Sequence, residues 1–296
     1  MKRFLFLSSI SVLLSACAGG GGGGSGTTFV NFNTPAKSTT QTADTLTSEI
    51  SYRYDSNGSL TFSDPELATG TVSATTDSSG TYSQYSKNGK NSSVNVGSDR
   101  QTATSGTATL ISLKSADLSD VGGIVTDPTY SYQSYGFWNT GANQSGVTHK
   151  GGYFSAGTAT PNAALNAKSG TASFSGTSVG TNWNSAGVPN SGSRGIESSV
   201  TMTADFSSRS GSIAFGNSKI SNGSGSMTPD ASFNMTGSLA WTSAANKFTG
   251  TLARNDGSTG ALNGRFYGPN AEETGGVFYT KNSTSFYSGA FGAKKQ

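Results

Sequence analysis

The chain has 296 residues, of which 12 % are charged and 10 % aromatic, and its formal net charge is +3. With one cysteine and one histidine, it can form neither an internal disulfide bond, nor a cysteine zinc site, nor a histidine metal cluster. No lysine or arginine stripe runs along the sequence, so a nucleic-acid partner is not expected.

The amino terminus has the pattern of a secretory signal peptide. Lys2 and Arg3 precede an apolar run at 4–14, and two small residues precede Cys17. A cysteine at the first mature position resembles bacterial lipoproteins, in which the thiol is diacylated by fatty acids such as palmitate and the preceding peptide is removed. The sequence therefore predicts a lipoprotein signal peptide at 1–16 and an acylated Cys17 that anchors the protein in lipid.

Two alternatives to this anchor are weaker. A transmembrane helix needs to cross roughly 30 Å of hydrocarbon, and the apolar run is too short for that. A buried cysteine behind an ordinary signal peptide is the other alternative. Ala18 stands where an aspartate would favour inner-membrane retention, so the outer membrane is the expected destination. Loss of Lys2 and Arg3 lowers the 19 basic residues to 17 against 16 acidic ones, a net charge of +1.

A flexible tether is predicted at 17–30, which includes consecutive glycines at 19–24. The glycines match G-x-G-x-x-G trivially, but neither a strand before them nor a helix after them supports a nucleotide-binding loop. The 41 glycines of the whole chain and its low net charge favour a folded β protein over disorder beyond the tether. Within 31–126, we expect strands at 50–54, 70–74 and 107–113.

The richest aromatic cluster in the chain contains Tyr130, Tyr132, Tyr135, Phe137 and Trp138. Alternation along a strand should direct only some of these rings inward. The candidate ligand-binding residues are Tyr130, Tyr132, Tyr135 and Trp138, because exposed tyrosine and tryptophan favour interfaces.

The single histidine, His149, precedes Lys150-Gly151-Gly152, which predicts a loop with an exposed imidazole. No cue other than abundant serine supports a Ser-His-Asp triad around it.

Period-two alternation is clearest in the second half, for example at Val200, Met202, Ala204 and Phe206. The sequence predicts strands at 171–176, 198–206, 210–215, 233–241, 247–254, 260–267, 275–280 and 285–291. Turn residues such as Asn222-Gly223 and those at 255–257 and 268–270 lie between them. About eight antiparallel strands in an up-and-down order predict a closed β-barrel, with a two-sheet sandwich as the alternative. A membrane-spanning barrel is less favoured, since one strand face is mostly Ser, Thr, Asn and Lys.

The final predicted hairpin carries a dense motif, GRFYGPNAEETGGVF at 264–278, and the chain closes with GAFGAKK at 289–295. These segments resemble the last hairpin of the β-barrel in the transferrin-binding protein B family. Ala159-Thr160-Pro161 and the strand at 170–176 also agree with the family, and the resemblance covers roughly 130–296. Two departures put the subfamily in doubt: 167–169 lacks the usual methionine-proline, and Phe174 replaces a tyrosine.

The chemistry of the motif is structural. Gly268 and Pro269 can form a tight turn, Gly275 and Gly276 allow close strand packing, and the motif rings fill the barrel. Glu272 is expected to accept backbone N–H bonds at the turn, with a binding role as the alternative. The structural motif residues are Phe266, Tyr267, Gly268, Pro269, Glu272, Gly275, Gly276, Phe278, Gly289, Phe291 and Gly292.

The resemblance implies a handle-like β-rich domain at 31–126 and a single barrel at 127–296. It further implies a surface lipoprotein that captures an extracellular protein or a small iron-related ligand and passes it to an outer-membrane transporter. A surface lipoprotein assembly modulator would export it. Some barrel relatives carry haem, and His149 could then supply an axial ligand beside the nearby tyrosines, although no cofactor is required.

Three other functions fit the sequence less well. Glu272 and Glu273 are adjacent, so they would face different directions rather than flank one bond, and an enzyme is not expected. A structural or adhesive surface lipoprotein without a role in iron uptake is the main alternative, because a fold does not fix a function. A lipocalin-like carrier is the third, but the aromatic motif residues favour a barrel filled by side chains.

Overall fold

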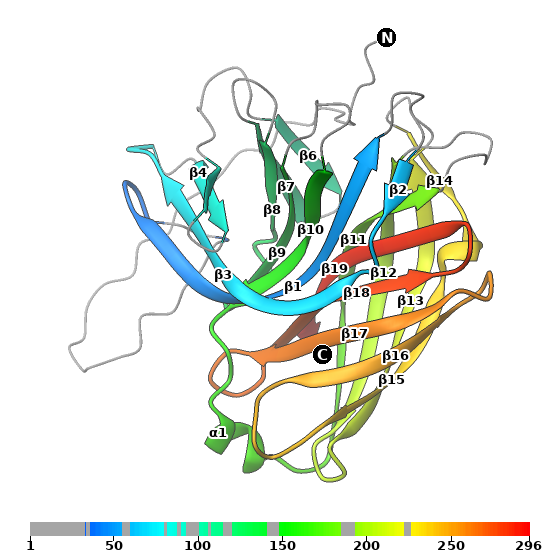
Figure 1. Cartoon of the computed structure of the whole chain (residues 1–296). Coiled ribbons are helices and arrows are strands. Elements are labelled where there is room, and N and C mark those ends of the chain that lie inside the picture. The colour runs from blue at the N-terminus through cyan, green and yellow to red at the C-terminus, as the bar shows by residue number, and fades with distance from the viewer. Residues whose placement is uncertain are drawn as a thin grey trace.

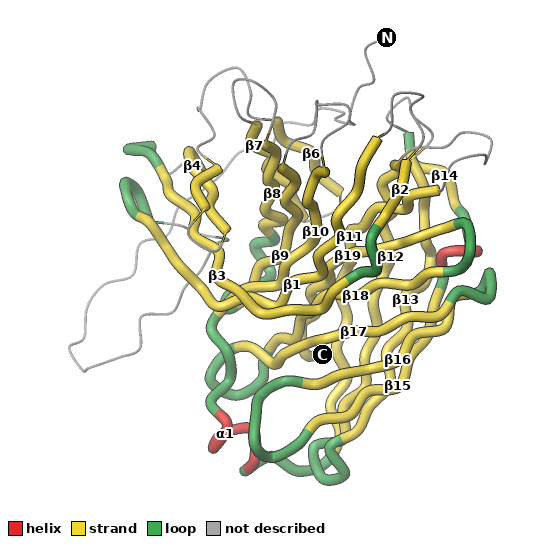
Figure 2. Tube along the Cα trace, in the orientation of Figure 1, coloured by secondary structure: helices red, strands yellow, loops and turns green. Residues whose placement is uncertain are grey.

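The computed structural model describes residues 33, 36–54, 60–79, 82–87, 90–92, 101–105, 108–114, 120–140, 148–184, 193–221 and 226–296. The predicted signal peptide, Cys17, the tether at 17–30 and the Asn222-Gly223 turn lie outside these residues. The described residues are mostly strands, arranged in two antiparallel sheets (Figures 1 and 2). Among them, no helix has both the length and the apolar character needed to cross a membrane.

The first sheet has ten strands in the order β5-β4-β3-β1-β10-β9-β8-β7-β6, with β2 paired to β1. The strands are β1 (Thr40–Tyr54), β2 (Leu60–Phe62), β3 (Glu66–Thr76), β4 (Tyr82–Lys87), β5 (Lys90–Ser92), β6 (Gln101–Ser105), β7 (Ala108–Lys114), β8 (Asp120–Thr126), β9 (Gln133–Thr140) and β10 (Thr148–Gly157). This sheet is the predicted handle-like domain, and we call it the handle sheet.

The second sheet is a closed eight-stranded barrel. Its strands are β11 (Thr171–Asn184), β12 (Ser193–Asp205), β13 (Ser210–Ser221), β15 (Met235–Trp241), β16 (Phe248–Arg254), β17 (Thr259–Tyr267), β18 (Glu273–Lys281) and β19 (Ser285–Lys295). The order β12-β11-β19-β18-β17-β16-β15-β13 closes because β12 also pairs with β13, and short β14 (Met227–Pro229) adds to β13. Closure confirms the predicted barrel and leaves no free edge among these eight strands.

The boundary between the two domains differs from the prediction. Strands β9 and β10 pair within the handle sheet, and β10 lies beside β1, so the barrel begins at Thr171 rather than at 127. Pro161 and the short helix α1 (Asn162–Asn166) separate the two sheets. The pairing of β1 with β10 joins segments about a hundred residues apart, which local periodicity does not reveal.

Phe233 is a second correction. It lies in the 3-10 helix η1 (Ala231–Phe233) instead of beginning the strand that ends at Trp241, and β15 starts at Met235. The Asp230 carboxylate accepts a hydrogen bond from the backbone N–H of Ser232, which favours a turn over a strand at this point. Phe233 is nevertheless buried in the barrel core.

The interior of the barrel is filled mainly by aromatic rings. Phe215 packs against Phe278 and Phe291, with ring centroids 4.8 and 5.7 Å apart. A second group surrounds Phe266, whose ring lies 5.2 Å from both Phe206 and Phe248. This confirms that motif rings fill the barrel, as predicted for Phe278 and Phe291, and disfavours a lipocalin-like cavity in this part of it.

The handle sheet lies against one side of the barrel (Figure 1), where β1, β9 and β10 contact β18 and β19. An apolar cluster crosses this junction and includes Leu46, Tyr135 and Tyr153 from the handle sheet and Val277, Phe286 and Ala290 from the barrel. The opposite face of the handle sheet buries its own small cluster, which contains Trp138 and Phe154.

Candidate functional site

Most of the residues that the sequence marked as ligand-binding lie in the junction between the handle sheet and the barrel. Tyr130 and Tyr135 are 4 % and 0 % exposed, and Trp138 is 9 % exposed. Alternation along β9 does send the rings to opposite faces, as predicted. However, the barrel covers one face and the handle core covers the other, so these three rings are not the exposed anchors that we expected.

The tyrosine hydroxyls fasten the handle sheet to the barrel wall. Tyr130 donates to the carbonyl oxygen of Gly292 over 2.7 Å. The hydroxyl of Tyr135 pairs with Thr177 over 2.7 Å, and that of Tyr153 pairs with Thr181 over 2.5 Å. Burial raises the pKa of all three tyrosines, so they stay neutral donors and acceptors.

Two motif glycines lie at the part of the barrel wall that contacts the handle sheet. Gly275 and Gly292 are cross-strand partners on β18 and β19. A Cβ atom on Gly275 would lie 2.2 Å from the amide oxygen of Gln133, and one on Gly292 would lie 2.7 Å from the Tyr135 ring. The absence of side chains here lets Gln133 and Tyr135 approach the barrel backbone, which explains these glycines by packing.

Glu273 closes the junction from the barrel side. The Glu273 side chain is 1 % exposed, and its two oxygens accept the backbone N–H groups of Ser131 and Tyr132 over 2.6 and 3.0 Å. Burial raises the pKa of Glu273, and the backbone hydrogen bonds and Lys294 oppose that rise only in part. No sequence pattern indicates this role, because Tyr132 and Glu273 are far apart along the chain.

The remaining motif residues behave mostly as predicted. Glu272 accepts the backbone N–H of Asn270 over 2.8 Å, which confirms its expected role at the turn. Gly268 has φ +84°, a conformation that favours glycine. Tyr267 is the exception: its hydroxyl pairs with Ser155 of the handle sheet over 2.9 Å, so it faces out of the barrel, and Phe266 takes the interior position.

His149 lies on strand β10 rather than in a loop, and it is 1 % exposed. The Tyr52 ring lies 5.1 Å from the imidazole at an interplanar angle of 30°. A haem iron needs open space on at least one ring nitrogen, and the described residues here do not form such a site. Haem ligation by His149 stays a prediction that would require this part of the sheet to move.

The barrel interior becomes polar near η1. The Arg254 side chain is 2 % exposed, forms a two-point ion pair with Asp256, and lies 4.7 Å from the centroid of the Phe233 ring. Burial disfavours the charged form of Asp256, but hydrogen bonds from Arg254 and Ser258 outweigh it and lower its pKa to about 2. These contacts close one end of the barrel with charged and polar groups.

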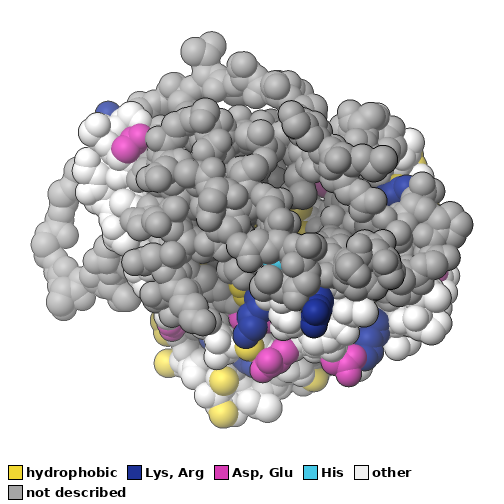
Figure 3. Space-filling model, turned by 45° about the horizontal axis from the view of Figure 1, so that its top comes forward, with side chains coloured by type: hydrophobic (Ala, Val, Ile, Leu, Met, Phe, Trp, Pro, Cys, Tyr) yellow, Lys and Arg dark blue, Asp and Glu magenta, His cyan; other side chains and the backbone are white. Residues whose placement is uncertain are grey.

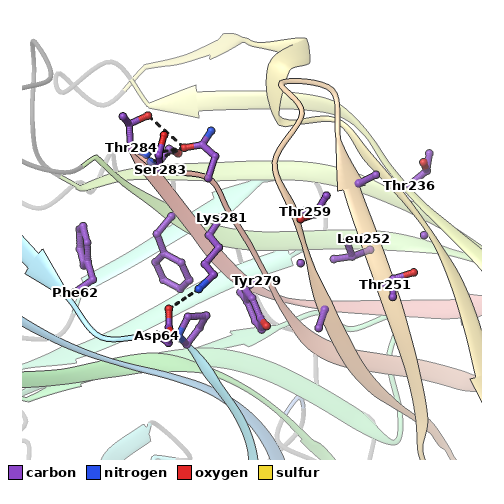
Figure 4. A pocket seen from close by; sticks show the side chains of 18 of the residues that line it. Phe62, Asp64, Thr236, Thr251, Leu252, Thr259, Tyr279, Lys281, Ser283 and Thr284 are labelled. Carbon is purple, nitrogen blue, oxygen red and sulfur yellow. Dashed lines mark hydrogen bonds and ion pairs between the residues drawn. The ribbon is translucent and has the colours of Figure 1, made fainter.

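An open groove of about 1110 Å³ lies between the handle sheet and the outer wall of the barrel (Figure 4). The segment at 62–65 forms one side, β15, β16 and β17 form the other, and the tip of the β18–β19 hairpin lies at one end. An ion pair between Asp64 and Lys281 joins the two domains here. None of the predicted ligand-binding residues lines this groove, and it depends on the domain arrangement, which sequence patterns do not show.

Within the described residues, no group of three or more histidine, cysteine, aspartate or glutamate side chains could hold a metal ion.

Comparison with known proteins identifies the barrel. The family of C-lobe and N-lobe beta barrels of Tf-binding protein B matches residues 167–295. Over these residues, the barrel is similar to the barrels of transferrin-binding protein B. The match confirms the resemblance seen in the final hairpin, but it starts near α1 and not at 130, in agreement with the boundary that the structure shows.

Three of the solved structures that the chain resembles are the following. A double mutant of transferrin binding protein B from Haemophilus parasuis is 13 % identical, with 87 % of this chain and 76 % of that chain covered and a TM-score of 0.46. A mutant of the Actinobacillus pleuropneumoniae protein is 15 % identical, with 85 % and 100 % covered and a TM-score of 0.46. The N-lobe of lactoferrin binding protein B from Moraxella bovis is 15 % identical, with 59 % and 80 % covered and a TM-score of 0.39. The search of curated proteins found no match.

Proposed function

We propose that this protein is a lipid-anchored binding protein on the surface of an outer membrane and that it captures an extracellular protein of the transferrin type. The observation that carries the proposal is the family match of residues 167–295, because the matched barrel is the one named for transferrin binding. Acylated Cys17 would provide the anchor, and the glycine tether would hold the folded domains away from the lipid.

The structure favours capture through the surface over storage inside the barrel. Aromatic rings occupy one part of the interior, and the Arg254–Asp256 pair closes the end near η1. Binding would then use loops and the outer faces of the two domains. An outer-membrane transporter would take a captured iron-related ligand onward, and a surface lipoprotein assembly modulator would export the chain. The proposed role includes no catalysis.

The test uses intact cells that express the full chain or a Cys17→Ser variant. Cells with the unaltered chain should bind fluorescent transferrin or lactoferrin and lose this binding after protease treatment, whereas the variant should be released from the membrane. Resistance of the chain to protease on intact cells would contradict surface display. Absence of binding to both proteins by a displayed chain would contradict transferrin-type capture and favour the structural or adhesive alternative.

A further inference from the structure

One wall of the groove is a continuous aromatic cluster. The rings of Phe62 and Trp183 lie 6.5 Å apart, those of Trp183 and Phe286 stack at 5.4 Å, and those of Phe286 and Tyr279 lie 6.4 Å apart. Trp183 and Phe286 are buried, whereas Phe62 and Tyr279 are only partly buried and line the groove. Figure 4 shows these two rings on the side of the groove nearest the handle sheet. They give the groove a fixed apolar surface.

The opposite wall carries short hydroxyl side chains in rows. Ser238 and Thr251 are cross-strand neighbours on β15 and β16, and Thr259 on β17 lies beside Ala253 of β16. Neighbouring strands are about 4.8 Å apart, so Ser238 and Thr251 present two hydroxyls at that spacing, and Thr259 adds a third two residues further along the wall. Ser238, Thr251 and Thr259 are all exposed.

These hydroxyls are available to a ligand. On the handle sheet, exposed hydroxyls bond to each other across strands, as Thr42 and Ser73 do over 2.7 Å. Among the described residues, Ser238, Thr251 and Thr259 make no such bond. Each therefore offers one donor and two acceptor positions to whatever enters the groove.

The groove has no net charge. Among the described residues that line it, Asp64 and Lys281 alone are charged, and they pair with each other. On the coloured part of the face in Figure 3, Lys and Arg side chains lie interspersed with Asp and Glu side chains. An anionic lipid, a nucleic acid or a strongly charged peptide would find no complementary field here.

Backbone pairing with a peptide is also blocked along the barrel wall of the groove. Both edges of β15, β16 and β17 are already paired within the closed barrel. An extended peptide therefore cannot add a strand to this wall and gain main-chain hydrogen bonds. A ligand must use its own polar groups against side-chain hydroxyls.

We propose that the groove binds a neutral oligosaccharide chain. The C–H faces of a pyranose ring would pack on Tyr279 and Phe62, and its hydroxyls would exchange hydrogen bonds with Ser238, Thr251 and Thr259. Sites for small ligands measure about 300–1,000 Å³, so a groove of about 1110 Å³ has room for a few sugar units. This site does not depend on transferrin-type capture, and either proposal can fail without the other.

Saturation-transfer NMR on the full chain, purified in a sugar-free zwitterionic detergent, tests the proposal. The probes are cellotriose, maltotriose and tri-N-acetylchitotriose, with a heparin fragment as the anionic comparison. We expect transfer to at least one neutral trisaccharide. Thr251→Val removes a hydroxyl and keeps the shape of the side chain, so it should raise the Kd about threefold to tenfold, the effect of one hydrogen bond.

The matched control is Thr203→Val, an exposed threonine on β12 that does not line the groove. It should leave the Kd unchanged. Tyr279→Ala should abolish transfer, and Tyr279→Phe, which keeps the ring and tests for a merely unfolded variant, should retain it. No transfer to any neutral probe at about 10 mM would overturn the proposal. Preference for the heparin fragment, or equal affinities for Thr251→Val and Thr203→Val, would overturn it too.

Discussion

The wall of the barrel has a covered half and an open half, and the two are built differently. In β15 and β16, on the open half, buried and exposed residues alternate, because only the inner face is packed. In β18 and β19, which the handle sheet covers, nearly every residue is buried. Side chains on the covered half are therefore packed on both faces of the strands, whereas those on the open half are packed only on the inner face.

This difference explains where the family motif lies. Gly275 and Gly292 leave room for the handle sheet, and Glu273 holds the backbone at 131–132 from the same wall. A substitution on the covered half must satisfy both the barrel core and the handle sheet, so few side chains fit. The outer face of the open half accepts many small polar residues, and that freedom leaves room for a binding groove.

Loss of the Glu273 side chain should have the largest effect on stability. Glu273→Ala would leave the backbone N–H groups of Ser131 and Tyr132 without their acceptor, and we expect the free energy of unfolding to fall by about 3 kcal/mol. Urea denaturation followed by tryptophan fluorescence measures this change. Glu272→Ala at the adjacent exposed turn is the control and should cost less than about 1 kcal/mol. Equal losses for the two variants would contradict the role of Glu273 at the junction.

An added methyl group on the covered half should lower the free energy of unfolding somewhat less than the loss of the Glu273 side chain does. A Cβ on Gly292 would lie 2.7 Å from the ring of fully buried Tyr135, so Gly292→Ala should lower the free energy of unfolding by about 2 kcal/mol through overpacking. On the open half, a Cβ on Gly216 would meet nothing closer than 3.7 Å. Gly216→Ala should stay within about 0.5 kcal/mol of the unaltered chain in the same denaturation assay. The comparison fails if both variants lose stability equally.

The sequence predicted the open half well because one buried face produces period-two alternation. Val200, Met202 and Ala204 are buried on β12, as their spacing indicated. Closure into a barrel followed from the number of strands and the turns between them. Phe233 shows the limit of this method, because its apolar spacing fits a strand while the side chain of Asp230 favours a turn.

The aromatic cluster shows a second limit. Tyr135 and Trp138 lie on β9, whose two faces are both covered, and Tyr130 precedes that strand. The surfaces that cover these rings come from the barrel or from other strands of the handle sheet, which are distant along the chain. Local composition cannot distinguish a ring that meets a ligand from one that meets another domain. The domain boundary was misplaced for the same reason, since β10 pairs with β1 at long range.

Glu273 at the covered half of the barrel and Asp256 at its polar end should make the free energy of unfolding depend on pH in opposite directions. The folded state raises the pKa of Glu273, so it binds that proton more tightly than the unfolded chain, and this stability is lost as pH rises through the raised value. The folded state lowers the pKa of Asp256 to about 2, so its contribution is present above the unfolded value and is lost as pH falls toward about 2.

Urea midpoints measured across acidic pH separate these contributions. In Glu273→Gln, the urea midpoint should fall less than in the unaltered chain as pH rises above the normal glutamate range. In Asp256→Asn, it should fall less as pH decreases toward the acidic end. Each variant serves as the control for the other, because one lies at the covered wall and the other at the polar end of the barrel. If both variants changed the dependence of the urea midpoint on pH in the same way, these two side chains would not be the source of the pH dependence.

The smallest effect is expected at His149. Because its imidazole is 1 % exposed and lies against Tyr52, a haemin titration of the full chain should give the same Soret spectrum for the unaltered chain and for His149→Ala. Lys150→Ala, at the exposed neighbouring position, controls for changes in non-specific haemin binding. A saturable Soret band that is lost only in His149→Ala would show that the strand opens far enough to expose a ring nitrogen. The covered face of the handle sheet would then be a ligand site as well as a fixed junction.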